Sequence, residues 1–179
     1  YNKAIVYYEK ADSLVNDFTY KEELVDVYQL TGQKDKALAV SKIVIAEMNK
    51  NAATGATDEN IGHYVDKELA YAYLKIDDYD KALEHALAEY NRRPNNIDVN
   101  ETLAWVYYQK GDYAKALPYI KVALKTNSKN PVLLCRAGLI FEKAGDKIKG
   151  KEYLEQALKS NANIPERLKL SSEQELKEI

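Results

Sequence analysis

The chain has 179 residues, 46% of them hydrophobic and 30% charged, and is long enough to bury a substantial core. Its 26 Lys and Arg residues nearly balance its 28 Asp and Glu residues, whereas nucleic-acid-binding proteins normally carry a basic face. The single cysteine, Cys135, excludes an internal disulfide, and no apolar run approaches the roughly 20 residues that a membrane-spanning helix needs.

The first predicted element is a helix over residues 1–16. Ala4 and Tyr8 lie 33 residues before Ala37 and Ser41, so this helix matches the second half of a repeated unit. We therefore expect a truncated N-terminal repeat, with the natural N-terminus and any targeting signal upstream, and we assign no cellular compartment. The exposed end of this repeat is also a surface through which two copies of the chain could associate.

Residues 17–50 are predicted to form a complete helical hairpin, followed by an inserted loop over residues 51–62. The positions that indicate the hairpin are Leu24, Val25, Tyr28, Gly32 and Ala37. The extra length falls in MNKNAATGATDENIG, which is rich in loop-forming residues. A longer helix followed by a surface loop accounts for this length; the alternative is a loop that leans over a concave face.

Three further units, residues 63–96, 97–130 and 131–164, repeat at a period of 34 residues. The stretches that show the period are YAYLKIDDYDKAL, VYYQKGDYAKAL and IFEKAGDKIKGK. Self-similarity at a fixed period of this length is the signature of a solenoid, in which each unit completes its core by stacking on its neighbours. The last unit is degenerate, because Gly150 stands where the preceding units have Ala82 and Ala116.

Each unit reads as two helices joined by a tight turn. In residues 97–130, apolar residues recur at three- and four-residue intervals up to Gly111, which we expect to end the first helix. Asp112 is expected to cap the second helix, which should run from Tyr113 to about Lys125. Pro118 lies inside that helix and is expected to bend it.

Residues 165–179 depart from the repeat pattern and are predicted to form a polar capping helix, the usual end of a solenoid. Ser171 with Gln174, or Ser172 with Glu175, has the spacing of a capping box.

The repeated unit resembles the tetratricopeptide repeat. Residues 97–130 carry small or apolar pairs, an aromatic residue, a Gly-Asp-Tyr turn and two alanines at that family's positions, namely Leu103, Ala104, Tyr107, Gly111, Asp112, Tyr113, Ala116 and Ala123. The preceding unit lacks the turn glycine and has Asp77 in its place. The resemblance implies an all-α, right-handed superhelical solenoid of antiparallel helical hairpins.

The sequence offers little chemistry. Phosphate-binding glycine motifs are absent, and the histidines, His63 and His85, are not spaced as metal ligands. Cys135 has no histidine predicted nearby, which favours a structural thiol. We therefore expect no catalytic residues, no metal and no cofactor, and the chain is predicted not to be an enzyme.

The resemblance instead implies recognition of a protein or peptide in a concave groove lined by the first helix of each unit. Asp98, Glu101, Trp105 and Tyr108 share one face of such a helix, distinct from the face of Leu103. Extending this register by 34 residues in each direction gives the predicted groove, which consists of Tyr64, Lys67, Tyr71, Leu74, Glu101, Trp105, Tyr108, Arg136 and Leu139. The alternative is that these rings only fill the angle between neighbouring hairpins.

Some relatives hold the C-terminal carboxylate of chaperones, but only Lys67 and Arg136 match that pattern here, so we predict no such clamp. Two other functions stay open. One is a structural spacer or oligomerisation scaffold within a longer protein. The other is a helical repeat that reads RNA, which would need a basic groove, whereas Glu101 and Asp98 lie in this one.

Overall fold

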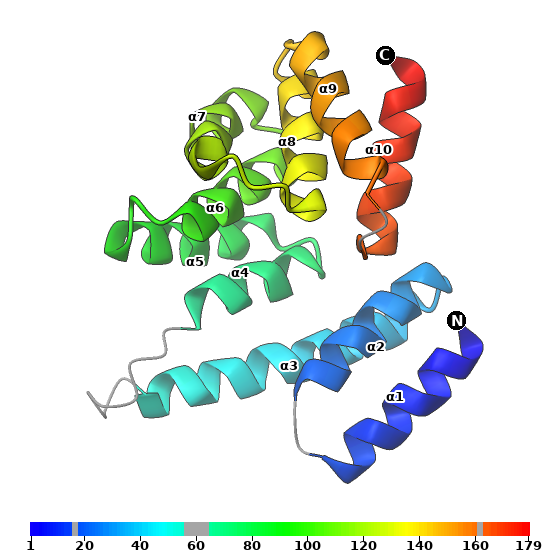
Figure 1. The fold of residues 1–179 in the computed structure, drawn as a ribbon. Coiled ribbons are helices and arrows are strands. Elements are labelled where there is room, and N and C mark those ends of the chain that lie inside the picture. Colours follow the sequence, from blue (N-terminus) through cyan, green and yellow to red (C-terminus); the bar gives the residue numbers. More distant parts are fainter. Residues whose placement is uncertain (16–17, 56–64, 161–162) are drawn as a thin grey trace. The chain divides into compact units, whose positions relative to one another are not determined.

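A computed structural model describes residues 1–15, 18–55, 65–160 and 163–179. The described residues form α-helices and one 3₁₀ helix, and no strand occurs among them (Figure 1). In chain order the elements are α1 (Asn2–Leu14), α2 (Phe18–Leu30), α3 (Lys34–Gly55), α4 (Asp66–Leu74), α5 (Tyr79–Arg92), α6 (Ile97–Gln109), α7 (Tyr113–Ala123), η1 (Leu124–Thr126), α8 (Pro131–Lys143), α9 (Lys147–Leu158) and α10 (Glu166–Glu178). The predicted all-α fold class is confirmed.

The chain divides into two compact units, residues 1–85 and 86–179. In the first, α1 packs along α2 and α2 along α3, as Figure 1 shows. The core between these helices contains Ile5, Leu24, Val25, Tyr28 and Ala37. The α4–α5 hairpin is held by His85, whose ring stacks on Tyr73 at 5.4 Å and whose Nδ1 lies 2.7 Å from an Asp66 oxygen.

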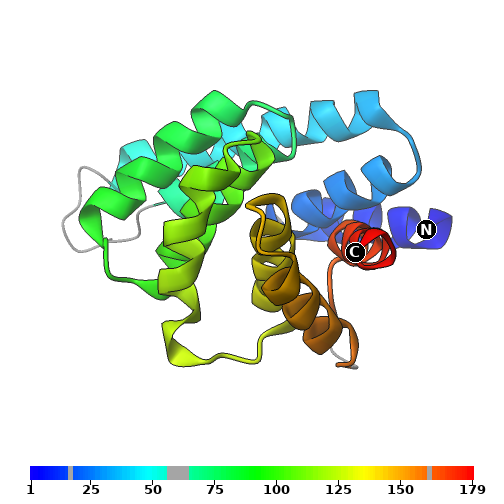
Figure 2. The ribbon, with the colours of Figure 1, turned by 90° about the horizontal axis from the view of Figure 1, so that it is seen from above.

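The second unit contains two hairpins, α6–α7 and α8–α9, and ends in α10, which packs on both α8 and α9 (Figure 2). One core cluster joins the two hairpins through Ala104, Ala116, Ile120, Ala137 and Phe141. A second cluster joins α8 and α9 to α10. The helix period of the sequence therefore buries one face of each helix against the next hairpin and leaves the charged face outside.

Four hairpin turns share one backbone geometry. Gly32, Asp77, Gly111 and Gly145 all have positive φ angles, of 74°, 59°, 82° and 95°. In each turn the amide of the following residue donates to a carbonyl near the helix end, as Asp112 does to Tyr107 at 2.9 Å. Asp77 thus adopts the left-handed conformation that glycine supplies at the other three turns.

Several local expectations need correction. Asp112 makes no side-chain cap hydrogen bond, whereas Asp78 and Asp146, at the equivalent positions, accept from backbone amides. The helix that starts at Tyr113 ends at Ala123, and η1 follows. α3 continues to Gly55, so residues 51–55 of the predicted loop are helical, and the rest of that loop lies outside the described residues.

The capping box proposed near Ser171 or Ser172 does not form, because α10 already begins at Glu166. Ser172 lies in the middle of this helix and is fully buried. The physical reason is that the apolar residues Leu168 and Leu176 pack on the second core cluster, which draws the whole segment into one helix.

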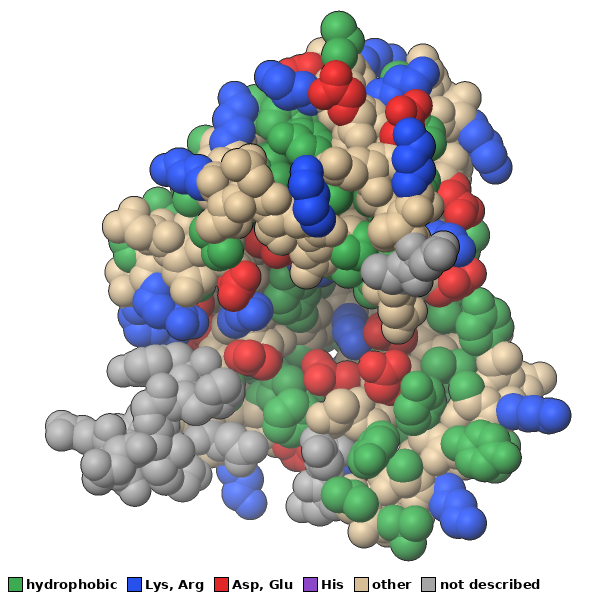
Figure 3. Space-filling view, viewed as in Figure 1, with side chains coloured by type: hydrophobic (Ala, Val, Ile, Leu, Met, Phe, Trp, Pro, Cys, Tyr) green, Lys and Arg blue, Asp and Glu red, His purple; other side chains and the backbone are tan. Residues whose placement is uncertain are grey.

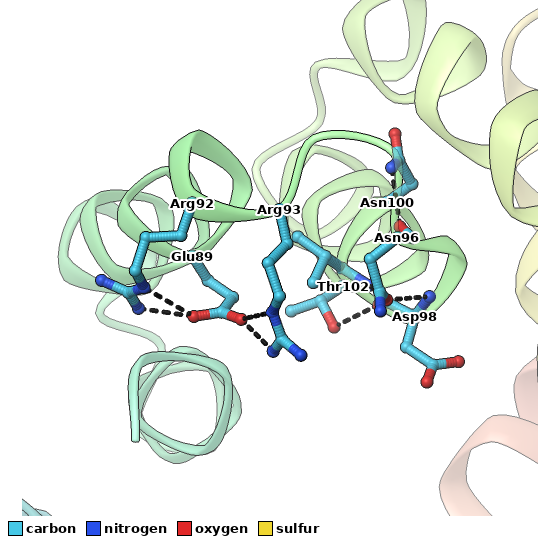
Figure 4. Close-up of polar contacts among 8 residues, drawn as sticks. Glu89, Arg92, Arg93, Asn96, Asp98, Asn100 and Thr102 are labelled. Atoms are coloured by element: carbon cyan, nitrogen blue, oxygen red, sulfur yellow. Dashed lines mark hydrogen bonds and ion pairs between the residues drawn. The ribbon is translucent and has the colours of Figure 1, made fainter. Parts of the chain in front are cut away.

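The connection from α5 to α6 is fixed by polar contacts, drawn in Figure 4. Glu89 is buried and lies between two guanidinium groups: Arg92 donates to its Oε2, and Arg93 donates to its Oε1 with Nε at 2.6 Å. Asn96 then caps α6 by accepting from the amides of Asp98 and Val99. These contacts satisfy the free amides that begin the helix.

Candidate functional site

In the second unit, α6 and α8 bring Glu101, Trp105 and Arg136 into direct contact. Arg136 Nη1 donates to Glu101 Oε1 at 2.8 Å, and the guanidinium carbon lies 5.2 Å from the centre of the Trp105 ring. The two charged side chains are only 15% and 16% exposed, so water screens this ion pair weakly. The cation above the ring adds a cation–π attraction.

Tyr108 extends this contact along α6. Its ring stacks on Trp105, with centroids 4.8 Å apart and planes 10° from parallel, and lies 5.5 Å from the ring of Tyr113. Burial raises the pKa of Tyr108 to about 12, and the nearby Glu175 carboxylate contributes to the rise. The hydroxyl therefore stays protonated at neutral pH, where it can donate a hydrogen bond.

We call Glu101, Trp105, Tyr108 and Arg136 the α6–α8 patch. Each member was part of the predicted groove, and the structure shows that they touch one another. An arginine and two stacked rings present planar surfaces in fixed orientations. Such a surface offers rigid apolar area and directed donors, the combination that is enriched at binding hot spots.

Leu139 was predicted to line the groove, and the structure shows instead that it belongs to the core. It is 1% exposed and packs with Leu134, Leu154 and Leu168. The 34-residue register gave it the groove-facing position of α8, but α10 packs on α8 and covers it. The apolar positions of α10 were the signal that could have shown this covering.

The remaining predicted groove residues belong to the first unit. Lys67, Tyr71 and Leu74 lie in α4 at steps of four and three residues, so they share one face of that helix, and all three are half-buried. Tyr64 lies outside the described residues.

One polar contact between α8 and α10 was missed by the sequence reasoning. Lys143 Nζ donates to Glu175 Oε1 at 2.8 Å and lies 3.1 Å from Glu142 Oε2. The bond to Glu175 is the main cause that raises the pKa of Lys143, so this residue remains a cation. No sequence motif signals this pair, because its members are 32 residues apart.

The sequence favoured a structural thiol at Cys135, and the residue is buried. Burial raises its thiol pKa, which disfavours the reactive thiolate. Across the described ranges, no group of three or more His, Cys, Asp or Glu side chains could hold a metal ion. In the same part of the chain, no helix is long and apolar enough to cross a membrane.

Comparison with known families and structures identifies the repeat. A family model described as tetratricopeptide repeat matches residues 97–130 and 132–164. A search of curated proteins gave no match.

Three solved structures have a similar fold. MamA (residues 41 to the end) from Desulfovibrio magneticus RS-1 superposes with a TM-score of 0.58 at 16% identity, over 85% of this chain and 81% of that one. TTC0263, a thermophilic TPR protein of Thermus thermophilus, gives 0.52 at 22% identity over 79% and 73%. YrrB, a TPR protein with an unusual peptide-binding site, gives 0.50 at 15% identity over 97% and 83%. At these identities the likeness shows a shared solenoid fold.

Proposed function

The chain carries tetratricopeptide repeats at residues 97–130 and 132–164, and from this premise we propose that it is a non-enzymatic protein-interaction module. Repeats of this family generally serve protein interaction, and the stacked hairpins offer an extended surface. The surface that we assign to the partner is the α6–α8 patch, and the ligand is an extended peptide or a helix of a partner protein.

The observation that carries this proposal is the fixed position of Arg136, held by Glu101 at 2.8 Å and placed over Trp105 at 5.2 Å. A guanidinium that is fixed before binding loses little conformational entropy when a ligand carboxylate or carbonyl accepts from it. The flat Trp105–Tyr108 stack beside it supplies apolar area for a side chain of the same ligand.

The test is affinity capture from an extract of the source cell, comparing the native chain with Trp105→Ala and Arg136→Ala. Lys121→Ala is the matched control, because Lys121 is exposed and lies on α7. All variants are first checked for helicity by circular dichroism. We expect a partner that the native chain and Lys121→Ala retain and that both patch variants lose.

The outcomes separate this function from the alternatives. Equal retention by all four chains would mean that recognition uses another surface. Retention of RNA rather than protein would revive the nucleic-acid hypothesis, although Lys and Arg side chains are scattered on the face drawn in Figure 3. No retained macromolecule at all would favour a structural spacer.

A specific observation also supports an oligomerisation scaffold. α1 exposes three large apolar side chains, Val6, Tyr7 and Leu14, at 62%, 72% and 74%. We propose that a second copy of the chain can pack on this face. Sedimentation velocity over a range of concentrations tests the idea: a monomer–dimer equilibrium that Tyr7→Glu with Leu14→Glu abolishes would support it, and a monomer at every concentration would refute it.

A further inference from the structure

We propose that a pocket between α2, α3 and α4 of the first unit binds the ammonium group of a lysine side chain from a partner protein. This second site lies outside the α6–α8 patch and rests on the proposed function only in that its ligand is a protein segment. Its acidic members are Glu22, Asp26 and Glu68.

The pocket carries an excess of negative charge. Lys75 Nζ lies 3.1 Å from an Asp26 oxygen and donates to the Glu22 carbonyl at 3.2 Å, so one bound cation faces three carboxylates. Burial raises the pKa of Glu22, Lys75 lowers it, and the neighbouring carboxylates Asp26 and Glu68 raise it further. Each carboxylate therefore feels the others, and a second cation would relieve this repulsion.

Two buried acceptors face this site without a partner of their own. The hydroxyl oxygen of Ser41, a residue that is 2% exposed, has no hydrogen-bond partner among the described residues, and neither does Glu68 Oε2. A buried polar atom without a partner is costly and uncommon in native structures. A donor group from a ligand would satisfy both kinds of acceptor.

The walls fit the rest of a lysine side chain. Glu22, Val25, Ser41, Val44, Ala72 and Lys75 line the pocket, which holds about 180 Å³ of empty space, part of it open to solvent. Val25, Val44 and Ala72 offer apolar contact to methylene groups, while Glu22 and Ser41 offer oxygens to the charged end. Lysine has this division, with an apolar stem and three donors on its ammonium group.

The register of the repeats places this pocket on the side expected to meet a ligand. Glu22 and Asp26 precede Lys67 and Tyr71 by 45 residues, the same interval that separates Leu24 from Leu69. In the first unit, the positions that correspond to the predicted groove are therefore acidic. An anionic ligand is excluded there by charge, and a basic one is attracted.

The test measures the affinity of the full chain for a dye-labelled peptide of alternating Gly, Ser and Lys by fluorescence anisotropy. A second peptide has every lysine Nε-acetylated, which removes the charge and keeps the stem. We expect the acetylated peptide to bind at least about tenfold more weakly, as the loss of a charge-assisted hydrogen bond predicts. Equal binding of the two peptides would overturn the proposal.

Variants locate the site. Glu22→Gln with Glu68→Gln should weaken lysine-peptide binding about tenfold, whereas the matched pair Glu152→Gln with Glu166→Gln, exposed and in the second unit, changes the net charge equally and should leave it unchanged. Equal weakening by the two pairs would mean non-specific charge attraction and refute the site.

Ser41→Ala guards against a variant that fails to fold. It removes a buried hydroxyl with no partner, so it should not lower stability, yet it should weaken binding severalfold. Unchanged binding in folded Ser41→Ala and unchanged binding in the folded carboxylate variant would both count against the pocket.

The failure of this inference is distinguishable from failure of the proposed function. If Arg136→Ala abolishes partner capture while the lysine peptide does not bind, the α6–α8 patch stands and the pocket falls. Spermidine serves as the arm for a small amine: competition by spermidine as strong as that of the unlabelled lysine peptide would show that no protein segment is selected, and would refute the proposal.

Discussion

Asp77 has the same left-handed backbone conformation as Gly111, with φ angles of 59° and 82°, although only glycine adopts it without a steric cost. Asp77→Gly should therefore stabilise the first unit by about 0.5 kcal/mol, which is less than the full cost of a left-handed residue because the flexible unfolded glycine offsets part of it. Gly111→Ala should destabilise the second unit by about 1 kcal/mol. Urea unfolding followed by circular dichroism measures both. A stability loss in Asp77→Gly would show that its hydrogen bond from Tyr79 outweighs the strain.

Gly150 lies where a side chain would strike the backbone of α8. A Cβ at this position would come within 2.9 Å of Glu142 Cβ and 3.0 Å of its amide nitrogen. Gly150→Ala should cost about 1–2 kcal/mol, since overpacking outweighs the gain in helix propensity. Urea unfolding followed by Trp105 fluorescence reports on this unit. Lys151→Ala, at an exposed neighbour, is the control, and an equal effect of the two would contradict the tight packing.

Ala116 occupies the equivalent place one repeat earlier and is fully buried. Ala116→Leu should overpack the contact between α6 and α7 and lower the free energy of unfolding by about 1–3 kcal/mol. Thermal melting measures the effect. A leucine accepted without change in melting would show that the two helices can separate there.

Glu89 is only 2% exposed, and its charge is compensated by Arg92 and Arg93. Replacing both arginines by alanine should cost about 3 kcal/mol, because an uncompensated carboxylate remains buried. Adding Glu89→Met to that variant should recover most of the loss, since the buried charge is then absent. Chemical unfolding of the three chains tests this, and no recovery would mean that the arginines act through packing of their stems.

Tyr108 predicts an alkaline sensitivity of the second unit. Burial raises its pKa in the folded chain to about 12, from 10.0, so the folded state binds this proton more tightly than the unfolded state does. The stabilisation is complete below pH 10 and is lost as the pH rises toward 12. In Tyr108→Phe, the decline of stability over this range, measured by urea unfolding with Trp105 fluorescence, should be shallower. An identical decline would assign it to other tyrosines.

Most of the hairpin architecture could be predicted from the sequence, because it is written in local patterns. The 34-residue period located the turns at Gly111 and Gly145, and the three- and four-residue spacing of apolar residues identified the helix faces. Local hydrogen bonds form these turns, so a dozen residues suffice to specify each one. The substitution of Asp77 at one turn was visible, but the φ angle that it accepts was not.

The sequence by itself determined the repeat, the all-α class and the residues of the α6–α8 patch, since each depends on spacing along one helix. Only the tertiary structure decided that Leu139 is covered by α10, that Arg136 lies over Trp105, and that Lys75 reaches Glu22 across 53 residues. The physical reason is that periodicity tells which face of a helix is apolar, whereas the partner of that face depends on how distant segments dock, and docking buries charges and hydroxyls that no local pattern places together.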